Sequence, residues 1–186
     1  MMPESSDLWV YLAFYFGAIV FHLGWHYVLR FWFEKVRAKS YFMEKNEKSK
    51  LRYLEKWNSN WNHIIVMVMC YINYLESQKD CDFFTDDVCF MKLRPRFVAV
   101  EMVYIGYITE NFIEYKYWIA DNDPTSKQMI IHHVMVVTGV WMGLYGGFAA
   151  AGVSNCACFC EVSAIFLNYR SMWSKKEMND PIPTVN

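Results

Sequence analysis

The sequence predicts an all-α integral membrane protein, a polytopic bundle of about five transmembrane helices. Its 186 residues are 55% hydrophobic and 19% aromatic, and only 20% are charged. A soluble domain is commonly ~45–50% apolar and ~25% charged, so this composition is shifted towards the membrane. The first apolar stretch, LWVYLAFYFGAIVFHLGWHYVL, has no polar face of the kind that a helix in a soluble bundle presents to water.

Five stretches are candidates for membrane crossing, which takes ~20 mostly apolar residues. They are residues 8–33, 61–75, 97–120, 129–145 and 148–168. The first is too long for a signal-peptide core and no basic segment precedes it, so we expect a retained helix. We divide the chain into an N-terminal segment with the first helix (1–33), a charged loop or amphipathic helix (34–60), a membrane domain (61–170) and a polar tail (171–186).

The distribution of basic residues predicts the orientation of these helices. Nine of the 18 Lys and Arg residues lie from Arg30 to Lys56, and four lie between residues 76 and 96. Since basic loops stay on the cytoplasmic side, residues 34–60 and the C-terminus are expected on one side and residues 76–96 on the other. The net charge of −1 argues against a nucleic-acid partner, which would require a basic surface.

Several ionisable and amide side chains fall inside the expected spans. A charged residue at membrane depth costs at least ~2.5–3.5 kcal/mol, so such groups face protein or water. The expected topology brings six of them to similar depths in one half of the bundle: Glu110, Glu114, His132, His133, Glu161 and Asn168. Imidazole at this depth suits a base, a nucleophile or a proton relay, whereas spacing alone favours a structural hydrogen-bond network.

Two smaller patterns lie outside that group. His22 and His26 are four residues apart on one helix face, where they could share a metal, but we favour polar anchoring or lipid contact and expect no metal. Cys81 and Cys89 flank a short acidic loop. They would form a disulfide if that side of the membrane is oxidising, and both states stay open.

Three segments carry a resemblance to a known family. GYITEN, QMIIHHVMVVTG and CEVSAIFLNYR resemble, in order and spacing, the TLC domain of ceramide synthases, the translocation-associated membrane protein and several lipid regulators. The matching residues are Gly106, Tyr107, His132, His133, Glu161, Ser163, Leu167, Asn168 and Arg170. The resemblance implies a helical barrel around a lipid-binding cavity.

The resemblance also implies roles for individual residues. In the ceramide synthases of this family, the His pair and acidic residues transfer an acyl group from acyl-CoA to a sphingoid base. Carried over, His132 or His133 is the base or nucleophile and Glu110 and Glu161 are its acidic partners. The remaining residues form a lipid-binding or structural polar network: Asn111, Glu114, Asn168 and Arg170.

Two departures from the family pattern shape the expected function. The family Asp falls on Asn111, which carries no charge, and the family continues with a further helix where this chain stops 16 residues beyond Arg170. We therefore expect a non-catalytic accessory subunit of a large membrane complex, with other membrane subunits and lipids as partners. No cofactor is expected other than a bound phospholipid or similar lipid.

The expected location is the mitochondrial inner membrane, in an assembly of the respiratory-chain type, because the chain is small and rich in lipid-facing helices. The alternative is a ceramide-synthase-like acyltransferase, or a lipid-sensing or lipid-regulating protein, in the endoplasmic reticulum.

Overall fold

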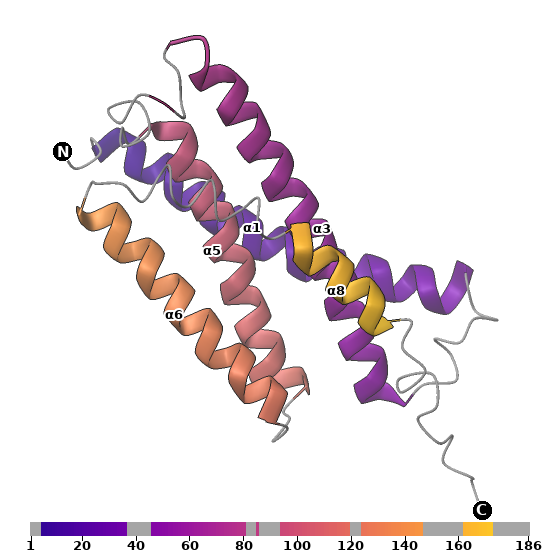
Figure 1. Cartoon of the computed structure of the whole chain (residues 1–186). Helices are drawn as coiled ribbons and strands as arrows, with labels where there is room; N and C mark the ends of the chain where they lie inside the picture. Colours follow the sequence, from indigo (N-terminus) through magenta and orange to yellow (C-terminus); the bar gives the residue numbers. More distant parts are fainter. Residues whose placement is uncertain are drawn as a thin grey trace, which may run out of the picture.

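The computed structural model is all-helical (Figure 1). It describes residues 5–36, 46–80, 85, 94–119, 124–146 and 162–172, and these contain no strand. The α-helices are α1 (Ser5–Phe31), α3 (Glu47–Ser77), α5 (Pro95–Ile113), α6 (Pro124–Gly146) and α8 (Val162–Met172). Two π-helical segments, η1 (Trp32–Val36) and η2 (Glu114–Ile119), continue α1 and α5. The predicted all-α class is confirmed.

One described helix, Leu8–Val36, is long and apolar enough to cross a membrane. The five-span bundle is therefore not confirmed by this measure. Most of the expected span 148–168 lies outside the described residues. Among the described helices, α3 carries four Asn residues and α5 carries Glu101 and Glu110 among its apolar residues. These polar side chains lower the mean hydropathy of α3 and α5, which are otherwise long enough to cross a membrane.

α3 is a single continuous helix from Glu47 to Ser77. It begins at the N-cap Asn46, whose side-chain oxygen accepts a hydrogen bond from the backbone N–H of Ser49 at 2.8 Å. Such a cap satisfies one of the free donors of the first turn. The expected boundary between a charged segment ending at residue 60 and a membrane helix starting at residue 61 thus falls inside one helix.

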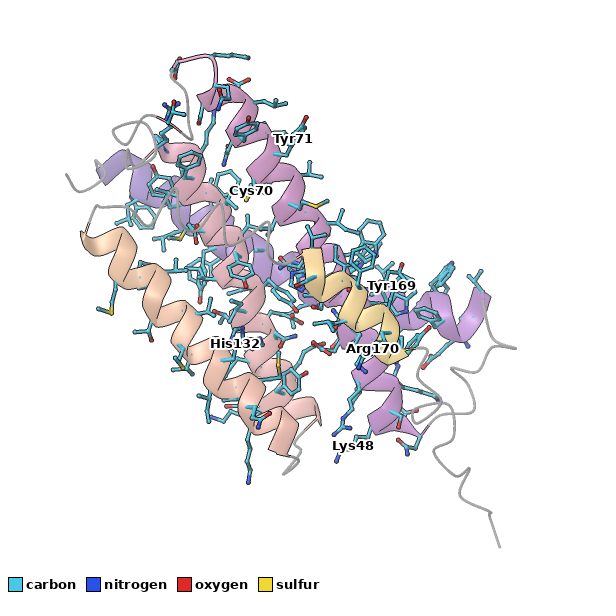
Figure 2. All side chains as sticks on the ribbon, viewed as in Figure 1. Lys48, Cys70, Tyr71, His132, Tyr169 and Arg170 are labelled. Atoms are coloured by element: carbon cyan, nitrogen blue, oxygen red, sulfur yellow. The ribbon has the colours of Figure 1, made fainter. Side chains whose placement is uncertain are left out.

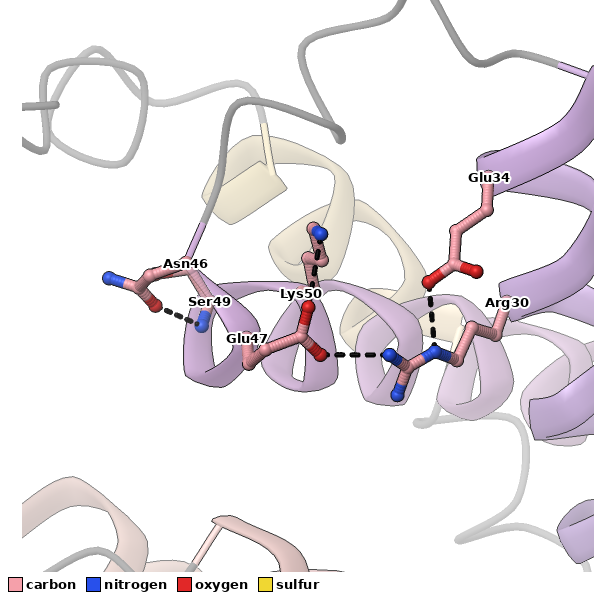
Figure 3. A network of polar contacts seen from close by, with 6 residues as sticks. All are labelled: Arg30, Glu34, Asn46, Glu47, Ser49 and Lys50. Atoms are coloured by element: carbon pink, nitrogen blue, oxygen red, sulfur yellow. Dashed lines mark hydrogen bonds and ion pairs between the residues drawn. The ribbon is translucent and has the colours of Figure 1, made fainter.

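A charged network joins the end of α1 to the start of α3 (Figure 3). Arg30 donates to Glu34 at 2.9 Å and to Glu47 at 2.8 Å. Lys50 donates to the other oxygen of Glu47 at 3.1 Å, and this hydrogen bond lowers the pKa of the Glu47 carboxyl. The network holds α1 and α3 in an antiparallel arrangement at this end.

α1 packs most extensively on α5, and the two helices come close together at Gly106. A Cβ atom at Gly106 would lie 2.6 Å from the backbone oxygen of Tyr15 and 2.8 Å from the Cβ of Ala18. Nearby, the Tyr15 hydroxyl donates to Thr109 at 3.1 Å. Small residues at such crossings let helix backbones come close enough to interact over a large area.

The remaining helices complete the bundle around α5. α3 runs antiparallel to α5, since Asn73 donates to the carbonyl of Arg96 and Asn111 donates to Glu55. α6 packs along α5, and α8 lies against α3 (Figure 1). An apolar core of Val66, Cys70, Val100, Tyr104, Tyr107 and Ile108 separates the two ends of the molecule.

In α1 and α3, many polar side chains are buried and many large apolar side chains are exposed, the inverse of the pattern of a soluble helix. α3 buries polar side chains such as Asn62, His63 and Asn73, while its large apolar side chains Tyr71 and Ile72 are about half exposed. α1 likewise exposes most of its large apolar side chains and buries His22 and His26.

Candidate functional site

Residues of four helices line an open cavity of about 440 Å³, here named the polar cavity. α3 contributes Glu55, Lys56, Ser59 and His63; α5 and η2 contribute Tyr104, Tyr107, Ile108 and Tyr115; α6 contributes Met129, His132 and His133; α8 contributes Ala164 and Asn168. Most of these side chains carry a hydrogen-bonding group. The volume is in the range of small-molecule sites, ~300–1,000 Å³.

Asn168 fixes α8 on α3 at the wall of this cavity. Its amide nitrogen donates to Ser59 Oγ at 3.2 Å and to Asn60 Oδ1 at 2.9 Å. Ser59 Oγ lies 3.0 Å from Nε2 of His63, one turn further along α3. Because Asn168 already supplies a donor to Ser59, the serine hydroxyl can donate its own proton to His63.

The two adjacent histidines of α6 both line the cavity but differ in exposure. His133 is buried, with its ring centroid 6.4 Å from that of Tyr115, whereas His132 is exposed. Nδ1 of His133 has no hydrogen-bond partner among the described residues. Figure 2 shows His132 on α6 and Arg170 on α8, the helices that flank the cavity. The cavity therefore has one buried imidazole and one at its mouth.

A second hollow of about 230 Å³, here named the apolar groove, adjoins the polar cavity. It lies between α5 and α6 and is lined by Ile108, Thr109, Phe112, His133, Val134, Val137 and Thr138. Ile108 and His133 belong to both linings. The polar cavity and the mainly hydrocarbon groove are thus neighbours that share these two residues.

Two buried carboxyl groups, those of Glu110 on α5 and Glu114 on η2, have partners on α3 and α1 and do not line the polar cavity. Glu110 accepts a hydrogen bond from Asn58 Nδ2 at 3.3 Å, and Asn58 Oδ1 lies 2.8 Å from Nδ1 of His22. Glu114 Oε1 lies 2.5 Å from Nδ1 of His26. The side chains of His22, His26, Glu110 and Glu114 are each at most 2% exposed.

The structure brings together some of the residues expected at one site and separates others. His132, His133 and Asn168 share the polar cavity, but Glu110 and Glu114 do not line it. Asn111 is buried and donates to Glu55 at 3.1 Å. Arg170 is exposed on α8 and does not line the cavity. Glu161, Cys81 and Cys89 lie outside the described residues.

Of the two uses expected for His22 and His26, polar anchoring and lipid contact, the second does not agree with their burial. Their exposed fractions are 1% and 2%, because α1 turns both rings towards α3 and α5. They serve as partners of Asn58 and Glu114. The described part of the chain also holds no group of three or more His, Cys, Asp or Glu side chains that could bind a metal.

Sequence reasoning missed the contribution of α3, which it treated as solvated up to residue 60. Glu55, Ser59 and His63 are spaced by four residues, and Asn58 and Asn62 repeat the same interval. That spacing places them on one face of a helix. A search for periodic polar residues, as well as periodic apolar ones, would have found this face.

Comparison of the chain with protein-family models, curated proteins and solved structures finds no match.

Proposed function

We propose that this chain is a lipid-binding, non-catalytic subunit of a membrane complex. The observation that carries the proposal is the junction between the polar cavity and the apolar groove at Ile108 and His133. A membrane lipid has the same two parts, a polar headgroup and a hydrocarbon chain.

The chemistry of the cavity wall fits a phospholipid headgroup. Lys56 and the imidazoles of His132 and His133 offer donors to a phosphate or ester oxygen, and the hydroxyl of Tyr107 is a further polar group on the wall. The side chains of Phe112, Val134 and Val137 would then contact the first part of an acyl chain in the groove. Burying that chain removes apolar area from water at ~25 cal/mol per Å².

The inverted burial pattern supports a multi-span arrangement for the bundle. Polar side chains in the interior and aromatic or aliphatic side chains on the outside suit a hydrocarbon solvent, where polar groups must find partners within the protein. α3 shows both halves of the pattern, with buried Asn62 and Asn73 and half-exposed Tyr71 and Ile72. We therefore extend the proposal to a TLC-like helical bundle with several membrane crossings.

The non-catalytic part of the proposal rests on Asn111 and Glu110, two described residues at or beside the position where the resembled family has its Asp. Asn111 stands where the resembled family has Asp, and its amide is engaged with Glu55. Glu110 is hydrogen-bonded to Asn58, away from the cavity. A general base needs a group that orients it and stabilises its charge, and neither residue reaches the imidazoles for that purpose.

The proposed setting is an accessory position in a larger assembly of the mitochondrial inner membrane, with the endoplasmic reticulum as the alternative. The outer face of α1, where Trp9 is 74% and Val20 is 69% exposed, offers apolar area to lipid or to another subunit. Gentle extraction followed by native-gel sizing and mass spectrometry tests this part. Migration with other membrane subunits is expected, and a monodisperse particle of one 22.2 kDa chain with lipid alone would contradict it.

Lipid retention in matched variants tests the binding function. Ala164 is half-buried on the cavity wall and Leu167, one turn away on α8, is 60% exposed and outside the lining. Ala164→Phe should fill the cavity and lower the lipid that co-purifies with the protein, measured by mass spectrometry per mole of chain. Leu167→Phe adds the same ring on the outer face and should leave that amount unchanged. Equal lipid content in all three proteins would refute the proposal.

A second candidate function is acyl transfer of the ceramide-synthase type. His132, His133 and Asn168 line the same cavity, and this favours it. All three match motif positions of the resembled family, in which the His pair is catalytic. Its test is acyl-CoA-dependent acylation of a sphingoid base by the purified chain. The accessory-subunit proposal expects no turnover, whereas turnover that disappears in His132→Ala or His133→Ala would establish the enzyme.

A further inference from the structure

A cluster of ionisable side chains lies between α1, α3 and the α5–η2 helix. We name it the carboxyl–histidine cluster and define it as His22, His26, Glu55, Asn58, Glu110 and Glu114. Its five ionisable members are between 0% and 7% exposed. Neither the polar cavity nor the lipid proposal uses Glu110, Glu114 or the two histidines.

The hydrogen bonds within the cluster determine where some protons reside. Asn58 donates its amide N–H to Glu110, so its oxygen accepts from Nδ1–H of His22. The 2.5 Å contact between His26 Nδ1 and Glu114 Oε1 likewise needs a proton between the two atoms.

Two carboxyl oxygens in the cluster have no partner. Oε1 of Glu110 and Oε2 of Glu114 find no hydrogen bond among the described residues. The two side chains are one turn apart on the same helix face and are 0% and 1% exposed. An ionised carboxylate with an unpaired oxygen in such a place is strongly destabilised, whereas a protonated carboxyl is not.

Among the described residues, the charged groups around the cluster do not neutralise three carboxylates. From α1, Arg30 faces it, but Arg30 is bonded to Glu34 and Glu47. From α3, Lys56 lies beside Glu55 at the cavity wall. The α5–η2 helix adds the hydroxyls of Tyr107 and Tyr115, and α6 adds His132 and His133 across the cavity. With one proton shared by His26 and Glu114, the remaining negative charge has to be balanced by further protons.

We infer that the carboxyl–histidine cluster is a proton-binding site that keeps Glu110 and the Glu114–His26 pair protonated at neutral pH. Glu55 belongs both to this cluster and to the wall of the polar cavity. It is therefore the carboxyl group of the cluster that also lines the polar cavity.

Infrared spectroscopy of the purified full chain in lipid nanodiscs tests the inference. Protonated carboxyl groups have a carbonyl band that ionised ones lack, and it shifts in D₂O. The wild type should show this band at neutral pH, and Glu110→Gln and Glu114→Gln should each lose part of it. Glu76→Gln is the control, because Glu76 lies on the surface between Lys79 and Arg96 and should contribute nothing. A neutral-pH spectrum without the band, or one unchanged in both variants, would overturn the inference.

The melting temperature of Glu110→Gln distinguishes a protonated Glu110 from an ionised one, because the two cases predict changes of opposite sign. Glutamine imitates a protonated carboxyl, so Glu110→Gln should keep or raise the wild-type melting temperature and should weaken its fall with rising pH. If Glu110 is ionised and held by an ion pair, the same variant should melt lower at every pH. The measurement is repeated with choline replacing sodium. A melting temperature that rises specifically with sodium would assign the cluster to a metal cation and would also overturn the proton site.

Discussion

At the scale of single residues, Gly106 decides how closely α1 and α5 pack. The backbone of Tyr15 and the side chain of Ala18 occupy the space that a Cβ atom would need. The same contact region contains Tyr15–Thr109 and positions His26 opposite Glu114. The glycine also belongs to the motif that carries the family resemblance, so its place in that motif has a steric explanation here.

Gly106→Ala should therefore destabilise the protein by about 1–3 kcal/mol, the usual cost of forcing an extra methyl group into a packed interface. Gly139→Ala on α6 is the matched control, because nothing lies within 4 Å of its added Cβ. Thermal or denaturant unfolding in detergent compares the two. A loss of stability in Gly139→Ala as large as that in Gly106→Ala would contradict the proposed close approach.

At the scale of elements, the joint between α1 and α3 depends on apolar packing beneath the Arg30–Glu47 network. Leu54 is fully buried against Leu29 and Phe33. Leu54→Ala should cost about 2–5 kcal/mol, since it leaves a cavity in addition to removing apolar contact. Leu75→Ala, at a position on the same helix that is 45% exposed, should change the unfolding free energy by only about 0.5 kcal/mol. If the two variants lose similar unfolding free energy, Leu54 is not part of an apolar core between α1 and α3.

The opposite end of α3 is joined to α5 by charges, which makes it sensitive to acid. Glu76 accepts hydrogen bonds from Lys79 and Arg96, and these lower the pKa of its carboxyl from 4.5 to about 2. Because the folded pKa lies below the unfolded one, the pairing stabilises the fold above pH 4.5 and its contribution is lost as pH falls towards 2. Glu76→Gln should flatten the stability–pH profile in that window, and added salt should diminish the difference between variant and wild type. A profile identical to that of the wild type at low salt would show that the pairing is not formed.

The helices themselves were largely predictable, and their partners were not. The expected spans 8–33, 97–120 and 129–145 agree with α1–η1, α5–η2 and α6, because long apolar runs identify buried or membrane-facing helices. The partner of Glu114, His26, depends on how α1 crosses α5 near Gly106, and the partner of Glu110, Asn58, depends on how α3 lies against α5. Depth along each helix placed these acids level with His132 and His133, but depth says nothing about the direction in which a side chain points around the helix.

At the scale of the whole molecule, the arrangement of helix ends predicts which loops share a side of the membrane. The start of α3 lies at the end of α1, through Arg30 and Glu47, while the end of α3 meets the start of α5 through Asp80 and Arg94. In sealed vesicles, protease should therefore reach residues 34–46 from one side and residues 81–93 from the other. Cleavage of both segments from the same side would rule out a membrane crossing by α3.

The central claim is that a lipid occupies the polar cavity with its chain in the apolar groove, and photo-crosslinking tests it most directly. A phospholipid with a photoactivatable group near the ester is incorporated into nanodiscs with the protein, and the labelled peptides are identified by mass spectrometry. The account predicts labels on residues 129–137 of α6 and 164–168 of α8, reduced at least several-fold in Ala164→Phe and unchanged in Leu167→Phe. Labels confined to the exposed outer face of α1, with the same yield in both variants, would contradict it.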